Sequence, residues 1–135
     1  MKRLLLAMAT IFAVACSNPK SEVAAEIAII PQPLSLTQHE NSFKIKSSTA
    51  LVCEAEELAP LVTYVQEYLV VKSVEQTPVS NYISLALDKS LAEEEYTLSV
   101  SNESVKIVAG GYGGAFNGVQ TLFQLLPSEV YTKQM

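Results

Sequence analysis

The longest helical pattern of hydrophobic residues lies near the carboxyl end of the chain. Beyond Gly113, four apolar residues spaced three, four and three apart share one helix face: Phe116, Val119, Phe123 and Leu126. Pro127 ends the predicted helix, because proline cannot continue the backbone hydrogen-bond ladder. Gly118 lies inside it and costs about 1 kcal/mol relative to alanine. We therefore expect a neighbouring element to pack closely against Gly118.

A second helix is predicted in the middle of the chain. Its apolar stripe has the same helical spacing and comprises Leu58, Leu61, Val62, Val65, Tyr68 and Leu69. Pro60 is tolerated in the first turn of this helix, where its missing N–H would have no partner. We expect a polar loop at residues 73–80.

Alternation of apolar and polar residues predicts strands on either side of this central helix. Short strands are expected at residues 34–36, 43–45, 49–53 and 83–87, and a β-hairpin at residues 96–100 and 105–109. The resulting order is β-β-β-α-β-β-β-α. It predicts an α+β domain that begins near Ile29, with a largely antiparallel sheet covered by two helices on one face.

Four glycines precede the last helix, at positions 110, 111, 113 and 114. We interpret them as a corner that reverses the chain between strand and helix. Glycine-rich corners can also cradle phosphates, but this one lacks the Lys-Ser/Thr pair of a phosphate loop. A dinucleotide fingerprint would need glycine or alanine where Phe116 stands. The structural interpretation is therefore favoured.

The amino terminus has the features of a secretory signal over residues 1–15. Lys2 and Arg3 precede a short apolar run, and small residues lead to Cys16. This pattern resembles a bacterial lipobox, so we expect Cys16 to be lipidated and residues 16–28 to include a spacer. The alternative is an ordinary signal peptide cut nearby, with Cys16 incidental.

The charge balance excludes some partners. The chain carries nine basic and 14 acidic residues, and removal of Lys2 and Arg3 leaves seven basic residues and a formal charge of −7. Arg3 is the only arginine, so the mature chain would contain none. We expect no nucleic-acid partner, because a basic patch supplies most of that affinity.

Residues capable of catalysis are few. A Ser-His-Asp set would have to use His39 and Asp88, yet His39 falls in a polar turn without a nucleophile motif. The pair His39-Glu40 begins a zinc-protease motif, but its second histidine would fall at Phe43. Cys53 lies in an apolar strand, and a buried, inert thiol is predicted there.

The remaining polar clusters also lack a specific pattern. Glutamates at 54, 56 and 57 and at 93–95 lack calcium-loop spacing and are typical of solvated faces. Asn102 begins a glycosylation-like triplet, but a hairpin turn is favoured there. The residues themselves therefore predict no catalytic or substrate-binding site, no metal and no cofactor in this chain.

Three segments resemble the amino-terminal domain of family-20 glycoside hydrolases, the β-N-acetylhexosaminidases. They are IIPQP at 29–33, EYTLSV at 95–100 and GAFNGVQTLFQLL at 114–126. The resemblance covers residues 29–131, and it implies a zincin-like α+β unit that holds no catalytic residues. In that family a (β/α)₈ barrel carries an adjacent Asp-Glu pair, the substrate's own acetamido group attacks the sugar, and no cofactor is involved.

From this resemblance we expect the non-catalytic part of an exported hexosaminidase, truncated before its barrel, with residues 132–135 beginning the linker. Expected partners are that catalytic barrel, N-acetylhexosamine-containing glycans bound through it, and a membrane reached by the lipid anchor. The expected location is the periplasm or outer membrane of a Gram-negative bacterium. The alternative is a stand-alone lipoprotein that uses the fold for binding or structure, and the DNA beyond codon 135 would discriminate the two.

Overall fold

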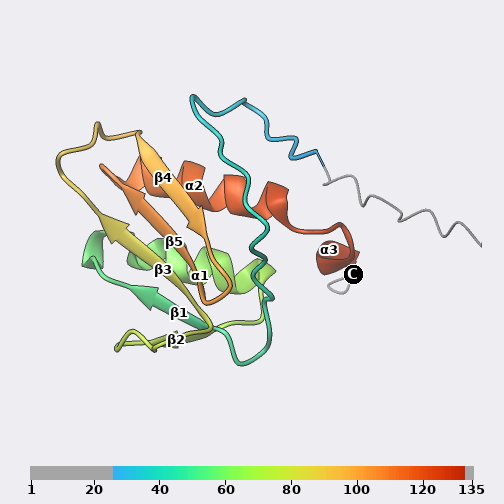
Figure 1. Ribbon diagram of the computed structural model, residues 1–135. Coiled ribbons are helices and arrows are strands. Elements are labelled where there is room, and N and C mark those ends of the chain that lie inside the picture. Colours follow the sequence, from blue (N-terminus) through green and yellow to red (C-terminus); the bar gives the residue numbers. More distant parts are fainter. Residues whose placement is uncertain (1–25, 133–135) are drawn as a thin grey trace, which may run out of the picture.

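The predicted strands and helices assemble into a five-stranded sheet with two long helices on one face (Figure 1). The computed structural model describes residues 26–132. Its elements are, in order, β1 Ala50–Cys53, the 3₁₀ helix η1 Glu56–Leu58, α1 Ala59–Tyr68, β2 Lys72–Val74, β3 Tyr82–Leu87, β4 Tyr96–Val100, β5 Ser104–Ala109, α2 Tyr112–Leu125 and α3 Glu129–Thr132. The α+β class and the two covering helices are confirmed.

The sheet is mixed, which corrects the expectation of a largely antiparallel one. Its strand order is β2-β1-β3-β5-β4. The pairs β1–β2, β1–β3 and β3–β5 are parallel, and only the hairpin β4–β5 is antiparallel. The parallel pairs arise because β5 inserts between β3 and β4, and because α1 carries the chain back across the sheet between β1 and β2. Such returns are not visible in local alternation.

The core lies between the sheet and the helices. One face of the central strands contributes Leu51, Ile83, Leu85, Val105 and Ile107, and the helices contribute Leu61, Val65, Ala115 and Val119. Burial of this apolar surface is the main stabilising term for such a domain. The opposite face of the sheet holds a smaller cluster built from Ala50, Val52 and Tyr82.

Two predictions for α2 are confirmed: a neighbouring element packs closely against Gly118, and the helix ends before Pro127. A Cβ atom on Gly118 would lie 2.6 Å from Cγ2 of Ile107 and 3.1 Å from the ring of Tyr96. The helix therefore packs directly on β4 and β5 at this position. Leu126, just before Pro127, has extended dihedral angles and ends the helix as expected.

The glycine corner has a different cause from the one expected. None of the chain's described glycines has a positive φ, so the turn does not need left-handed backbone. A Cβ atom on Gly110 would instead lie 1.9 Å from the carbonyl oxygen of Ala92, and one on Gly114 would lie 2.5 Å from that of Glu95. Glycine is needed because the connection before β4 runs against this corner.

Residues 26–49 contain no strand, so the strands predicted at 34–36 and 43–45 are wrong. This segment crosses the end of the sheet at which β1, β3 and β5 begin (Figure 1). Side chains hold it there: the backbone N–H of Ser42 donates to Oδ1 of Asn102 over 3.0 Å, and Phe43 and Ile45 pack against the core. An extended segment can therefore bury apolar side chains against the core without pairing to a neighbouring strand.

Two short elements were not expected. Strand β2 occupies the start of the predicted loop at 73–80, and α3 follows Pro127. The signal at residues 1–15, Cys16 and most of its spacer lie outside the described residues, as does nearly all of the linker beginning at 132. Within residues 26–132, no helix is long and apolar enough to cross a membrane.

Candidate functional site

The residues considered for acid–base catalysis do not form a site. The carboxylate of Asp88, just beyond β3, accepts hydrogen bonds from the backbone N–H of Ser90 at 2.9 Å and from its hydroxyl at 2.6 Å. These bonds lower the pKa of Asp88 below its usual value of 3.8. A general acid needs the opposite shift. His39 lies in the exposed segment before β1, and no hydrogen bond joins it to Asp88 in the described chain.

Cys53 is half-buried, whereas a buried thiol was expected. Its Sγ donates a weak hydrogen bond to the carbonyl oxygen of Ala55 over 3.1 Å. It packs at the margin of the main core. The geometry is that of a structural cysteine between β1 and η1.

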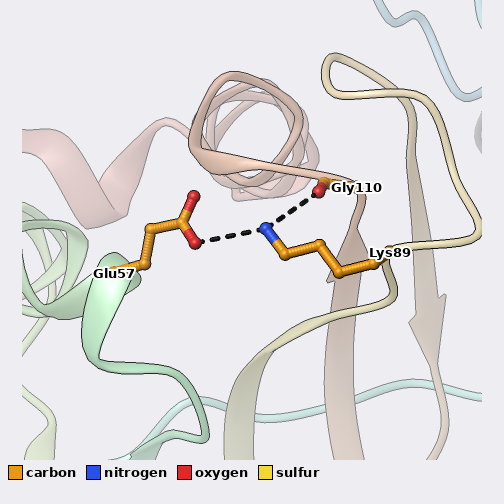
Figure 2. A network of polar contacts seen from close by, with 3 residues as sticks. All are labelled: Glu57, Lys89 and Gly110. Atoms are coloured by element: carbon orange, nitrogen blue, oxygen red, sulfur yellow. Dashed lines mark hydrogen bonds and ion pairs between the residues drawn. The ribbon is translucent and has the colours of Figure 1, made fainter.

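The glutamates at 54, 56, 57 and 93–95 are exposed, and one of them, Glu57, forms an ion pair with Lys89. Figure 2 shows Nζ of Lys89 between Glu57 and the glycine corner, donating to Oε2 of Glu57 at 3.2 Å and to the carbonyl oxygen of Gly110 at 3.5 Å. The ion pair is well exposed, so its contribution to stability is at most about 1 kcal/mol. No group of three His, Cys, Asp or Glu side chains between residues 26 and 132 is placed to hold a metal ion.

A shallow groove lies between the carboxyl halves of α1 and α2, and we call it the aromatic groove. It has a volume of about 470 Å³. Tyr64 and Tyr68 line it from α1, and Phe123 lines it from α2. Leu126 and Ser128, which lie between α2 and α3, also line the groove.

The rings of the aromatic groove contact one another. Tyr64 meets Tyr68 edge to face with 5.2 Å between ring centroids, and it lies 5.9 Å from Phe123. Tyr68 and Phe123 are 5.1 Å apart. Such ring pairs add about 0.5–1.5 kcal/mol beyond the area they bury. The Coulombic interaction with Tyr64 and the hydrogen bond to its side chain raise the pKa of Tyr68 above its usual value.

Two glutamines of α2 complete the groove, and their amides are already bonded within the domain. Nε2 of Gln120 donates to the Tyr64 hydroxyl at 2.7 Å. Gln124 accepts from the backbone N–H of Ile30 at 2.8 Å and donates to the Ile30 carbonyl at 2.9 Å. The Gln124 amide therefore fastens the amino-terminal segment to the end of α2.

The lining of the aromatic groove lacks the groups that transfer protons in glycoside hydrolysis. None of its lining residues carries a carboxylate or an imidazole, the groups that transfer protons in such reactions. Sequence reasoning placed Tyr68 and Phe123 in apolar stripes but missed Tyr64 and both glutamines. The available signal was spacing: Tyr64 and Tyr68, like Gln120 and Gln124, are four residues apart and so adjacent on a helix.

Comparison with known proteins now identifies the domain. The family model described as glycosyl hydrolase family 20, domain 2, matches residues 26–134. The chain belongs to this family. The expected resemblance to family-20 hexosaminidases is thereby confirmed.

Curated relatives and solved structures agree with this assignment. A beta-hexosaminidase of Porphyromonas gingivalis is 34% identical over 130 residues, covering 86% of this chain and 17% of the relative. The GH20 β-N-acetylhexosaminidase from Streptomyces coelicolor superposes with a TM-score of 0.65 at 26% identity, covering 73% of this chain and 21% of that one. The β-N-acetylhexosaminidase from Bacteroides fragilis shares the fold, with a TM-score of 0.63, 21% identity and the same two coverages.

The family-20 domain therefore spans about a fifth or less of the enzymes it matches. Most of each relative's polypeptide lies outside the matching region.

Proposed function

We propose that this chain is the non-catalytic domain 2 of an exported β-N-acetylhexosaminidase, an enzyme that hydrolyses terminal N-acetyl-β-hexosaminides. The match of residues 26–134 to domain 2 of family 20 carries the proposal. Catalysis is assigned to a (β/α)₈ barrel outside these residues, where the substrate's acetamido group acts as nucleophile.

The chemistry of the described residues supports the assignment of catalysis to another domain. Hydrolysis needs a carboxylic acid at the leaving oxygen and a group that holds the acetamido in line for attack. Asp88, the only Asp of the chain, lies in an exposed turn where Ser90 donates two hydrogen bonds to its carboxylate, and the glutamates at 54, 56, 57 and 93–95 are exposed. The aromatic groove offers rings and amides but no acid.

A hybrid enzyme tests the proposal. In it, residues 26–134 of this chain replace the matching region of the P. gingivalis beta-hexosaminidase, and the same enzyme with that region deleted serves as the control. We expect the hybrid to release chromophore from an aryl N-acetyl-β-glucosaminide. We expect the 135-residue chain alone and the deleted control to release none. Turnover by the chain alone, lost on substitution of its own acids, would refute the proposal, as would a folded but inactive hybrid.

We also propose that the protein is exported and anchored through lipidated Cys16, which would place it in the periplasm or outer membrane. The short apolar run that ends in small residues before Cys16 supports this. Cys16→Ser should abolish acylation and move the protein from the membrane to the soluble fraction after export. A wild-type protein that is already soluble after export would show that Cys16 is not a lipid anchor.

A further inference from the structure

The chain before β1 is fastened to the domain at two points and is exposed between them. At the first point, the Gln124 amide bonds both the N–H and the carbonyl of Ile30. At the second, the N–H of Ser42 donates to the side chain of Asn102. All but one of residues 31–41, which lie between these points, are exposed. We call this segment the leucine loop, and both of its ends are held by the domain.

The leucine loop presents apolar side chains to solvent. Leu34 is fully exposed and Leu36 is 54% exposed. The hollow of about 470 Å³ beside them is lined only by residues 26–36, so none of the described strands or helices covers it. Figure 1 shows this part of the chain, in blue, outside the outline of the sheet and helices. Contiguous apolar surface of this kind marks a contact with a membrane or with another protein.

Charge separates the leucine loop from the rest of the domain. Between Glu26 and Glu40 the chain contains no Asp, Glu, Lys or Arg, and exposed Lys44 and Lys46 follow the loop. By contrast, residues 49–125 contain ten acidic and three basic residues. An anionic lipid surface would therefore repel the body of the domain more than it repels the segment before β1.

The position of the loop along the chain indicates the surface that it meets. Ile30 follows Cys16 by 14 positions, so even a fully extended connection keeps the start of the loop within about 50 Å of a lipid attached to Cys16. A tether of this length gives the loop a high effective concentration at the bilayer surface. The bilayer offers the hydrocarbon contacts that Leu34 and Leu36 do not find in the domain.

We propose that the leucine loop inserts into the outer part of the lipid bilayer, with Leu34 and Leu36 as the inserted side chains. The inference rests on the proposed lipid anchor and adds a second membrane contact. A lipid on Cys16 alone is a flexible tether, whereas a loop held at Ile30 and Ser42 fixes the orientation of the domain on the surface. Because both ends of the loop are held before it meets lipid, less conformational entropy is lost on insertion.

The test attaches the chain to vesicles without depending on acylation in the cell. The chain is produced from Cys16 onward, which retains every described element, and Cys53→Ser leaves Cys16 as its only thiol. Cys16 is coupled to a maleimide lipid in vesicles of phosphatidylethanolamine and phosphatidylglycerol. Because the chain has no tryptophan, Leu34→Trp and Leu36→Trp each introduce a single fluorescent reporter. Val79→Trp is the matched control, because Val79 is 95% exposed between β2 and β3.

Lipids with brominated acyl chains quench tryptophan that reaches the hydrocarbon. We expect both loop reporters to shift their emission to shorter wavelength and to be quenched, while the Val79→Trp reporter keeps the emission of an exposed side chain. Adding Leu34→Asp to the Leu36→Trp protein should abolish the quenching, because a carboxylate is costly to place in hydrocarbon. Val79→Asp should leave it unchanged. Circular dichroism verifies that each variant is folded, and unquenched loop reporters in a folded, coupled chain would overturn the proposal.

Two other occupants of the leucine loop are separate outcomes. If Leu34→Asp lowers the activity of the hybrid enzyme in the absence of vesicles and Val79→Asp does not, the loop contacts the catalytic part and the proposal is overturned. If sedimentation shows that the uncoupled chain dimerises, and Leu34→Asp but not Val79→Asp abolishes the dimer, the loop meets a second copy and the proposal is again overturned.

The proposed function is judged by different measurements. Activity of the hybrid enzyme tests the assignment to a hexosaminidase, and fractionation of Cys16→Ser tests the lipid anchor. Unquenched loop reporters leave both of these intact. An exported chain without acyl groups on Cys16 would remove the anchor, and the membrane contact of the loop would be overturned with it.

Discussion

Adjacent glycines at the start of α2 provide a stringent test of the packing around the glycine corner. Alanine should have opposite effects at Gly113 and Gly114. A Cβ atom on Gly113 would lie 3.5 Å from Cγ of Glu94, which is an ordinary contact with a flexible side chain. A Cβ atom on Gly114 would lie 2.5 Å from the backbone oxygen of Glu95 and 3.0 Å from that of Glu93. Backbone atoms cannot rotate away as a side chain does.

The expected magnitudes follow from these distances. Gly113→Ala should stabilise the domain by up to about 1 kcal/mol, because alanine favours the helix. Gly114→Ala gains the same helical preference, but forced packing against backbone opposes it by about 1–3 kcal/mol. It also strains the hydrogen bond from Gly114 N–H to the Glu93 carbonyl, measured at 3.1 Å, which adds about 1 kcal/mol. The two variants should differ by about 2–4 kcal/mol in the free energy of unfolding.

Urea unfolding of the 135-residue chain, followed by circular dichroism, measures this difference. For a domain of this size the two melting temperatures should also differ by more than about 8 °C. Equal m-values in the two variants would verify that the comparison concerns the folded state. If both variants shift the midpoint in the same direction by the same amount, close approach of the connection before β4 does not select glycine at position 114.

Two further substitutions test the core and the Asp88 turn. Phe123→Ala should lower the free energy of unfolding by about 3–5 kcal/mol, because Phe123 is only 6% exposed and contacts both Tyr64 and Tyr68. A loss below about 1 kcal/mol in a urea melt would contradict the placement of Phe123 in the core. Ser90→Ala should raise the pKa of Asp88 toward 3.8 in an NMR titration, because the hydrogen bond from the Ser90 hydroxyl contributes most to lowering that pKa. An unchanged pKa would show that this hydrogen bond is not the cause. The pKa of Asp88 is lower in the folded state than in the unfolded state. The stabilisation by the Asp88 carboxylate is therefore present above pH 3.8 and is lost as pH falls through the folded-state pKa. Ser90→Ala should reduce the part of the unfolding free energy that depends on pH in this acidic range.

The sequence alone was sufficient to predict most elements and the faces they bury. The stripe through Leu61 and Val65 and the alternation through Val105 and Ile107 both correspond to fully buried residues of one core. Such patterns are reliable because burial of one side imposes a period of 3.6 on a helix and 2 on a strand. Gly118 was also interpretable from the sequence, since an unfavourable residue inside a helix needs a compensating contact.

The candidate site was only partly predictable. Tyr68 and Phe123 were visible as apolar residues of two helices expected on one face of the sheet, but nothing local showed which residues of the two helices would meet. The groove exists because α1 and α2 both return over the same face of the sheet, which brings Tyr64 and Gln120 within hydrogen-bonding distance although they are 56 residues apart. Contacts at such separations are set by topology and not by periodicity.

Strand direction was likewise decided by the tertiary structure alone. Alternation tells which side of β1, β3 and β5 faces the core, but it is the same whether a neighbour runs parallel or antiparallel. Only the hairpin β4–β5 could be assigned, because a short turn between its strands leaves no other arrangement. The same limit applies to the segment before β1. Phe43 and Ile45 alternate with polar residues and are partly buried against the core, yet the segment forms no strand.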